Sequence, residues 1–375
     1  MELGFAHAYH LPLSLLPWDG RSFAERLDKS FTLMRAAGAT SFRPHIPWNS
    51  VEPVIKSPLI KVADVTDYLV DRYIAGEVAN HSPGERAIFW DENDLLMDKM
   101  AEHGINPFVC LGVAYFAQLP LVEIKNGLTR FNPSHIPLEN YLGHLYLHTR
   151  AVVRRYKSKC KRWQLENEIN GAGIHAALGW RKGYIWFSRS VQTKVLEIIH
   201  RAVRQEDPEA VTCHNFMIPL KTVPYFYTYK NQLRMWDKYL DVVGIDPYPN
   251  FMQGLPLEVE KEFNKIIGEV KAMGVNKPIY IMETGYPARP GARGFSEENQ
   301  KEYYAQALDV AERNKIHSLF FYCFTSQEGS PGAEWCSDKQ TNDIQDWWGL
   351  IRADGTARPA YDFLVDRAQA TRLIK

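Results

Sequence analysis

Two glutamates stand at the ends of apolar segments that lie far apart in the chain. Glu168 closes the string W-Q-L-E-N-E that begins at Trp163, and Glu283 ends the run P-I-Y-I-M-E, just before a Thr-Gly turn. An ionised carboxylate at the tip of a buried strand is costly unless it is paired, hydrated or used in chemistry. Two such groups that face one another can supply an acid/base and a nucleophile. We therefore take Glu168 and Glu283 as candidate catalytic residues.

Either glutamate alone could simply meet solvent at a strand end. The presence of both, with Asn167 before one and Gly285 after the other, favours a catalytic pair. Glu166 is the nearest rival to Glu168. Because side chains alternate along a regular strand, Glu166 would point the same way as Glu168 but one layer deeper. We interpret Glu166 as a buried, paired structural acid.

The elements that would position these acids follow a repeating order of strand, loop and helix. Short apolar or alternating segments predict eight strands, at 3–9, 40–46, 106–112, 163–171, 210–214, 239–246, 277–283 and 316–324. Helical periodicity, with glycine or proline at the breaks, predicts helices at about 22–37, 91–103, 138–156, 184–205, 256–273, 296–314 and 359–367. Eight strands alternating with helices predict an α/β fold of the (β/α)₈ barrel type.

We expect residues 1–375 to form one catalytic domain. Two regions interrupt the rhythm: an insertion at about 49–90 after strand two, with a possible short helix at 65–75, and a long loop at about 325–358 after strand eight. Long irregular segments are usually functional, so both are expected to shape the site. An open doubly wound sheet would need a glycine-rich phosphate turn after the first strand, and G-F-A-H-A-Y-H is not one.

The chemistry of such a barrel gathers at the C-terminal ends of its strands. The candidate residues at the predicted ends are His7, His10, Arg43, His45, Tyr115, Asn167, Glu168, His214, Asn215, Asp246, Tyr248, Glu283, Tyr322 and Gln327. His7, His45 and His214 are expected to donate hydrogen bonds to sugar hydroxyls or to satisfy polar groups at the barrel mouth. His7 and His10 also invite a metal interpretation. Their spacing of three puts them on opposite faces of a strand, which argues against a metal site.

Aromatic residues make up 13% of the chain. They could pack a core, or they could offer flat platforms to a ligand such as a sugar ring, with apolar faces and polar edges. The tryptophans expected in loops on the active face are Trp48, Trp180, Trp335, Trp347 and Trp348. Of these we take Trp48 and Trp335, together with Tyr115, as candidate substrate contacts. Trp335 lies in the long loop that would form a subsite wall.

The residues at the strand ends resemble those of a known family. The chain looks like a retaining glycoside hydrolase of clan A, whose members share a (β/α)₈ barrel. They carry Asn-Glu at the end of strand four as the acid/base and Glu at the end of strand seven as the nucleophile, which Asn167-Glu168 and Glu283 match. The strings N-E-I-N-G and E-T-G-Y-P resemble the endo-galactanases of this clan. The chain departs from the clan at strand eight, where Y-C-F-T at 322–325 replaces a common tryptophan.

This resemblance implies double displacement at a β-glycosidic bond of an oligo- or polysaccharide. The two carboxyl groups of a retaining enzyme lie about 5–5.5 Å apart. Glu283 must be ionised, and the resemblance assigns Arg43 and Tyr248 as its neighbours. Glu168 must be protonated, a form that burial and the negative charge of Glu283 would favour. Asn167 would bind the sugar 2-hydroxyl, and no metal or organic cofactor is implied.

Composition limits the choice of partners. Lys+Arg and Asp+Glu both number 44, so the formal charge is zero and neither nucleic acid nor an anionic membrane is expected. No apolar stretch approaches 18 residues, and no leader precedes the first predicted strand. We expect a cytoplasmic protein as the sequence stands, or a secreted or periplasmic one if a leader has been removed. The sequence does not predict the oligomeric state.

Three alternatives to the hydrolase stay open. A transglycosylase would use the same two glutamates with a sugar acceptor in place of water. A non-catalytic carbohydrate-binding barrel would bind sugars without turnover, and the two acids argue against it. A metal-dependent hydrolase would lose its activity in chelator.

Overall fold

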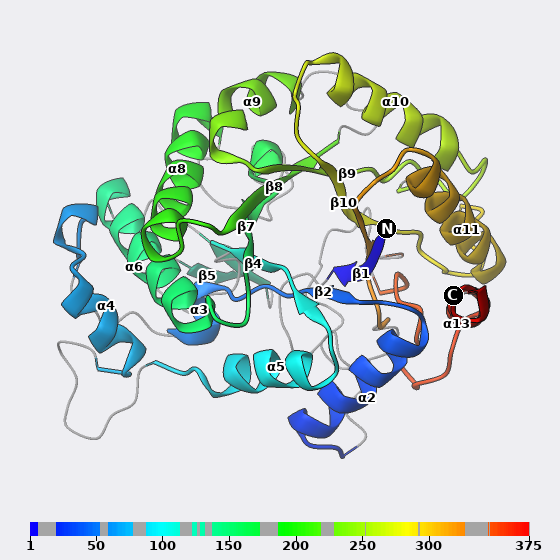
Figure 1. Ribbon diagram of the computed structural model, residues 1–375, viewed down its shortest axis with the longest axis horizontal. Helices are drawn as coiled ribbons and strands as arrows, with labels where there is room; N and C mark the ends of the chain where they lie inside the picture. The colour runs from blue at the N-terminus through cyan, green and yellow to red at the C-terminus, as the bar shows by residue number, and fades with distance from the viewer. Residues whose placement is uncertain are drawn as a thin grey trace.

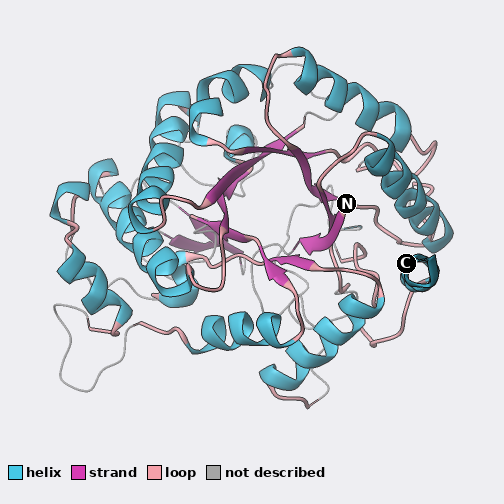
Figure 2. Ribbon diagram, viewed as in Figure 1, coloured by secondary structure: helices cyan, strands magenta, loops and turns pink. Residues whose placement is uncertain are grey.

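The computed structural model describes residues 1–6, 20–52, 59–77, 88–112, 122–125, 128–131, 137–172, 187–218, 229–251, 253–291, 293–326, 344 and 346–374. Within these ranges the strands form a ring and the helices surround it, as Figures 1 and 2 show. The predicted (β/α)₈ barrel is therefore confirmed.

The ring is a parallel sheet in the order β3-β2-β1-β11-β10-β9-β8-β7-β4. Its strands are β1 (Glu2–Ala6), β2 (Ser41–Arg43), β3 (Asn106–Pro107), β4 (Val109–Leu111), β7 (Arg162–Asn167), β8 (Val211–Met217), β9 (Val242–Asp246), β10 (Ile279–Thr284) and β11 (Ser318–Tyr322). β3 and β4 are two halves of the third predicted strand, interrupted at Phe108. Because β3 pairs with β2 and β4 pairs with β7, this one strand closes the ring.

The helices of the outer layer follow the predicted positions closely. They are α2 (Phe23–Ala36), α5 (Asp91–Glu102), α6 (Leu138–Tyr156), α8 (Arg189–Glu206), α9 (Tyr229–Trp236), α10 (Val259–Ala272), α11 (Glu297–Arg313) and α13 (Pro359–Ile374). The start of α2 shows why: Ser22 accepts from the Glu25 backbone while the Glu25 side chain accepts from Ser22, which satisfies two orphan N–H groups. Helix α9 and the antiparallel hairpin of β5 (Val122–Lys125) and β6 (Leu128–Phe131) were not predicted.

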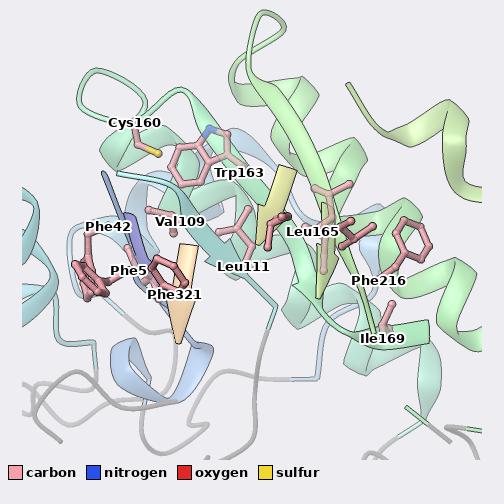
Figure 3. Close-up of a cluster of buried hydrophobic side chains, with 14 of the residues drawn as sticks. Phe5, Phe42, Val109, Leu111, Cys160, Trp163, Leu165, Ile169, Phe216 and Phe321 are labelled. Atoms are coloured by element: carbon pink, nitrogen blue, oxygen red, sulfur yellow. The ribbon is translucent and has the colours of Figure 1, made fainter. Parts of the chain in front are cut away.

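Alternation along the strands sorts the side chains into two layers. Outward residues such as Phe5, Leu165 and Phe216 pack beneath the helices, as Figure 3 shows. Inward residues fill the lower barrel with a second apolar cluster, comprising Ala6, Phe108, Cys213, Val242, Met282 and Phe320. Gly4 makes room for this cluster, because a Cβ there would lie 2.5 Å from the Phe320 ring. The lower barrel is therefore packed, and inward polar side chains gather towards the C-terminal ends of the strands.

The insertion after strand two contains the short helices α3 (Trp48–Val51) and α4 (Asp67–Ile74), and the 3₁₀ turn η1 (Val62–Asp64). Helix α4 corresponds to the short helix predicted at 65–75. It lies outside α6 (Figure 1) and buries the outer face of that helix. Gly143 of α6 permits the approach, since a Cβ there would lie 2.3 Å from the carbonyl oxygen of Ile60. Asn140 donates to the same oxygen at 3.2 Å.

Candidate active site

Glu283 lies near the end of β10 and is buried, with 7% of the residue exposed. Its carboxylate accepts hydrogen bonds from two sides. Arg43, at the end of β2, donates from Nη1 to Oε1 at 2.8 Å. Tyr248, two residues beyond β9, donates from its hydroxyl to Oε2 at 3.0 Å. Each oxygen thus has its own donor, and such contacts fix a carboxylate in one orientation.

Arg43 is a fully buried guanidinium with a different partner on each nitrogen. Besides Glu283, it donates from Nε to Gln164 Oε1 at 2.5 Å and from Nη2 to Asn167 Oδ1 at 2.7 Å. Burial is the largest single influence and lowers the pKa of Arg43, but the charge of Glu283 together with the charge of Asp246 and the hydrogen bond to Glu283 outweighs it, so the net pKa lies above its ordinary value. Arg43 therefore remains a permanent cation that links β2, β7 and β10 across the barrel interior.

The charge on Glu283 is set by opposing effects. Burial raises its pKa, the charge of Arg43 lowers it, the charge of Glu168 raises it, and the hydrogen bonds from Arg43 and Tyr248 lower it. The net pKa lies above the ordinary value of 4.5. Glu168, which is partly exposed, raises the pKa of Glu283 through its charge, so the two carboxyl groups lie close enough to interact. The structure thus brings the two candidate acids to the same end of the barrel.

The end of β7 departs from regular strand geometry. Glu166 and Glu168 have φ of 62° and 45°, a left-handed conformation that is rare for residues other than glycine. The register with β8 shifts between Gln164 and Asn167, so these two residues, three apart, both reach Arg43. The expectation that Glu166 and Glu168 share a direction on a regular strand is therefore wrong. Left-handed backbone of this kind costs about 1–3 kcal/mol per residue and gathers at functional sites.

Glu166 is buried, as predicted, but its carboxylate lies away from Arg43. A Cβ built on Gly112 would be 2.9 Å from Glu166 Oε2 and 2.6 Å from Ile199 Cδ1 of α8. This places the acid on the helix side of the strand. Its Oε1 accepts from the backbone N–H of Asn167 at 3.2 Å. Glu166 thus braces the turn that presents Asn167 and Glu168.

Asn215 of β8 joins the polar groups into one network. Its Nδ2 donates to Asn167 Oδ1 at 2.8 Å and to Asp246 Oδ2 at 2.5 Å. Its Oδ1 accepts from the Glu168 backbone N–H at 3.0 Å and from Gln164 Nε2 at 2.7 Å. Sequence reasoning placed Asn215 and Asp246 at strand ends without a role and missed Gln164. The available signal was an amide inside an apolar strand, where a buried polar group needs partners.

The prediction that His214 contacts the substrate is corrected by its surroundings. The ring is fully buried, and Nδ1 lies 2.7 Å from the carbonyl oxygen of Leu165. It packs edge-on against Phe216 and Trp236, with centroids 4.9 and 5.4 Å away. Because Asn215 faces the interior, alternation turns His214 outward towards α9.

The prediction for Trp48 is corrected in the same way. Its side chain is 1% exposed, stacks on His144 with centroids 5.3 Å apart, and donates from Nε1 to Glu52 at 2.9 Å. A ring enclosed in this way offers no platform to a sugar. His45 is also buried, and alternation from Arg43 puts it on the inner side of the barrel.

Trp348, expected in a loop on the active face, lies outside the helices and strands and is buried against Tyr248. Its ring meets Tyr248 edge-on at 5.5 Å and Tyr322 edge-on at 5.8 Å. Trp348 thus lies behind the tyrosine that donates to Glu283. His7, His10, Tyr115, Trp180, Gln327 and Trp335 lie outside the described residues, so the roles assigned to them stay predictions.

The described part of the chain holds no cluster of three or more His, Cys, Asp or Glu side chains arranged to bind a metal ion. Within those same ranges, no helix combines the length and apolar character needed to cross a membrane. The site is therefore described by its carboxyl, amide, guanidinium and hydroxyl groups.

No protein-family model and no curated protein matches the sequence. Among solved structures, the chain is similar to a family 39 glycoside hydrolase from Bacteroides cellulosilyticus WH2, at 18% identity and a TM-score of 0.58, over 99% of this chain and 64% of that one. It is also similar to the exo-β-1,4-mannosidase Op5Man5 from Opitutaceae bacterium strain TAV5, at 13% identity and 0.60, over 100% and 60%. A third is Bacteroides uniformis β-glucuronidase 2 covalently bound to cyclophellitol-6-carboxylate aziridine, at 16% and 0.59, over 98% and 35%.

This chain spans less than two thirds of the length of each of these three proteins. At such low identities the likeness establishes the shared barrel. All three neighbours are glycoside hydrolases by name, which is consistent with the clan A resemblance drawn from the strand ends. The structural comparison therefore supports the fold of this chain, a (β/α)₈ barrel.

Proposed function

We propose that this protein is a retaining glycoside hydrolase that cleaves β-glycosidic bonds of an oligo- or polysaccharide. The observation that carries the proposal is the grip on Glu283: Arg43 and Tyr248 each hold one of its oxygens, and Glu168 acts on it electrostatically. A carboxylate fixed by two donors beside a second, more exposed carboxyl group suits double displacement. A carbohydrate is the substrate class proposed.

In the first step Glu283 attacks the anomeric carbon through one carboxylate oxygen. The bond from that carbon to the leaving oxygen breaks, and Glu168 transfers its proton to the leaving group. A covalent glycosyl ester on Glu283 and an alcohol result. Arg43 and Tyr248 orient the attacking carboxylate, because their hydrogen bonds fix it before substrate arrives.

In the second step water attacks the anomeric carbon and Glu168 accepts its proton. Esterification has removed the negative charge of Glu283, so in this step the carboxylate of Glu168 faces a neutral ester. Cleavage of the ester regenerates Glu283 as a carboxylate. Two inversions at the same carbon leave the β-configuration unchanged.

Chemical rescue tests the assignment. Glu283→Gly should lower kcat on 4-nitrophenyl β-glycosides by at least about a thousandfold, the scale of removing a reacting group. Azide should restore turnover on a dinitrophenyl glycoside and give the α-glycosyl azide. Glu168→Ala with azide should give the β-azide, because its nucleophile is intact. Glu260→Gln, a surface change on α10, serves as the control.

A β-azide from Glu283→Gly would contradict the nucleophile assignment. A wild-type protein that cleaves none of a panel of β-gluco-, galacto-, manno- and xylosides or polysaccharides would contradict the hydrolase itself. The same glycosyl ester can be intercepted by a sugar hydroxyl. Product analysis at rising acceptor concentration therefore separates hydrolysis from transglycosylation.

A further inference from the structure

Asp246 is a buried acid that the mechanism above leaves unused. It is 1% exposed at the end of β9 and lies on the inward face, in the fields of Glu283, Glu168 and Arg43. Its Oδ2 accepts from Asn215 Nδ2 at 2.5 Å. Its Oδ1 is buried and has no hydrogen-bond partner in the described part of the chain. A buried acid with an oxygen left without a partner lowers stability, so its presence here needs an explanation.

The purpose follows from counting the hydrogen bonds of Asn215. A primary amide has two N–H donors and one oxygen with two lone pairs. Here both donors are used, on Asn167 and Asp246, and both lone pairs are used, by Glu168 N–H and Gln164 Nε2. The amide is therefore fully satisfied in one orientation. Asp246 supplies one of the four contacts.

Loss of the Asp246 acceptor would leave a buried N–H of Asn215 unpaired, which is costly. Rotation to regain a partner would weaken the contacts that Asn215 makes with Asn167 and Glu168. Asn167 Oδ1 accepts from both Asn215 and Arg43, so any contact of this side chain with a sugar hydroxyl uses its Nδ2 end. The direction of that donor depends on Asn215 and, through it, on Asp246.

We propose that Asp246 is a positioning residue that fixes, through Asn215, the direction in which the Asn167 amide meets the sugar 2-hydroxyl. The proposal rests on the proposed hydrolase function. It assigns a purpose to an acid that touches neither the nucleophile nor, in this geometry, the reacting atoms.

The kinetic test uses the 4-nitrophenyl β-glycoside that the wild type cleaves fastest, together with its 2-deoxy analogue. Asp246→Ala should lower kcat/KM on the parent glycoside about ten- to a hundredfold, the size expected for a contact in a charged network. On the 2-deoxy analogue the loss should be below about threefold, because no 2-hydroxyl is present to bind. Asp246→Asn keeps a carbonyl acceptor and should recover most of the activity.

The matched control is Asp241→Asn. Asp241 precedes the same strand at the opposite end of the barrel, where it accepts from the Thr212 backbone at 2.7 Å and from Arg204 at 2.6 Å. This change should leave the ratio of kcat/KM on the parent glycoside to kcat/KM on the 2-deoxy analogue at its wild-type value. Equal losses on both substrates in Asp246→Ala would reduce Asp246 to a structural role and overturn the proposal.

A second measurement does not need activity. Asp246→Ala, Asn167→Ala and the double variant are unfolded in urea, and the shifts in midpoint are compared. Coupling through Asn215 predicts that the double variant shifts less than the sum of the single variants, whereas Asp246→Ala with Asp241→Asn should be additive. Additive shifts for 246 and 167 would overturn the proposal. A wild type inactive on every glycoside would overturn the hydrolase while this coupling stays readable.

Discussion

Two buried arginines of this barrel, Arg150 and Arg43, lie beside carboxylates whose pKa values shift in opposite directions. Arg150 of α6 is 1% exposed, donates from Nε to Glu206 of α8 at 2.6 Å and also contacts Asp67 of α4. Arg154 joins the same group, bonding Glu206 at 2.7 Å and Asp67 at 2.6 Å. Hydrogen bonds from Arg154 and Arg150 hold the pKa of Asp67 below its ordinary value.

Arg43 faces the reverse balance. One guanidinium lies among Glu283, Asp246 and Glu168, all within a closed barrel. Burial raises the pKa of both Asp246 and Glu283, and the neighbouring acids raise each further. At the periphery, Arg150 and Arg154 pair with acids of α4 and α8 and so hold the insertion against the barrel. The interior network keeps an excess of acid, and acids with perturbed pKa values mark functional sites.

The largest expected effect comes from the interior cation. Arg43→Met should lower kcat/KM by about a thousandfold or more, since Glu283 loses its cation and Asn167 loses a donor. The free energy of unfolding should fall by about 3–5 kcal/mol, because a buried charge is left unpaired. Steady-state kinetics and urea unfolding measure the two. Full activity in Arg43→Met would remove the central difference between the networks.

Tyr248→Phe should have the next largest effect. It removes the hydroxyl that donates to Glu283 Oε2 and should lower kcat about ten- to a hundredfold. That hydrogen bond lowers the pKa of Glu283, so its loss should raise the pKa. Glu283 must be ionised to attack, and the acidic limb of the kcat/KM profile should therefore move to higher pH. A shift to lower pH would contradict the assigned role.

Arg150→Met should act on stability alone. We expect unfolding to be easier by about 1–3 kcal/mol, less than for Arg43→Met because Arg154 still bonds Glu206. The kcat per folded molecule should match the wild type. Burst titration of active sites after mild heating would separate a loss of folded protein from a loss of chemistry, and a fall in kcat would show that the two networks communicate.

The smallest effects should appear as pH slopes of opposite sign. The folded pKa of Asp246 is raised above its ordinary 3.8, so its contribution to stability is fully present below about that pH and is lost as pH rises through the folded pKa. Asp246→Asn should thus gain on the wild type as pH rises, by at most about 1.4 kcal/mol per pH unit. The folded pKa of Asp67 is lowered, so above about pH 3.8 the free energy of unfolding of Asp67→Asn should fall below that of the wild type. Parallel melting curves across pH would remove the contrast.

Much of the barrel was predictable because its strands are apolar runs between clear breaks. The eight strand positions and the helix at 138–156 follow from periodicity alone. The hairpin of β5 and β6 was overlooked although V-E-I-K-N-G-L-T-R-F places Asn-Gly between two alternating segments, which is a strong hairpin signal. Helix α9 was overlooked although Pro224 breaks the chain shortly before it. Strand ends also told which face of the molecule to search, since parallel strands present their C-terminal residues together.

Orientation was harder to predict than position. His214 and Asn215 are neighbours, and one residue of register decides which of them faces the interior. Trp48 lies beside a predicted strand end, yet it is buried by contacts with His144 and Glu52. His144 is far away in the sequence, and nothing in the sequence marks Glu52 as a partner of Trp48. The left-handed backbone at Glu166 and Glu168 has no sequence signal, because neither residue type favours it.

The contacts of Arg43 tie together residues that are 121, 124 and 240 positions away in the chain. A nascent barrel lacking β10 would hold a guanidinium without its counter-charge and a nucleophile not yet in place. Catalysis is therefore possible only once β10 has paired with β9 and β11. After dilution from denaturant, the recovery of turnover would report the closure of the barrel. Circular dichroism would report the formation of its helices and strands.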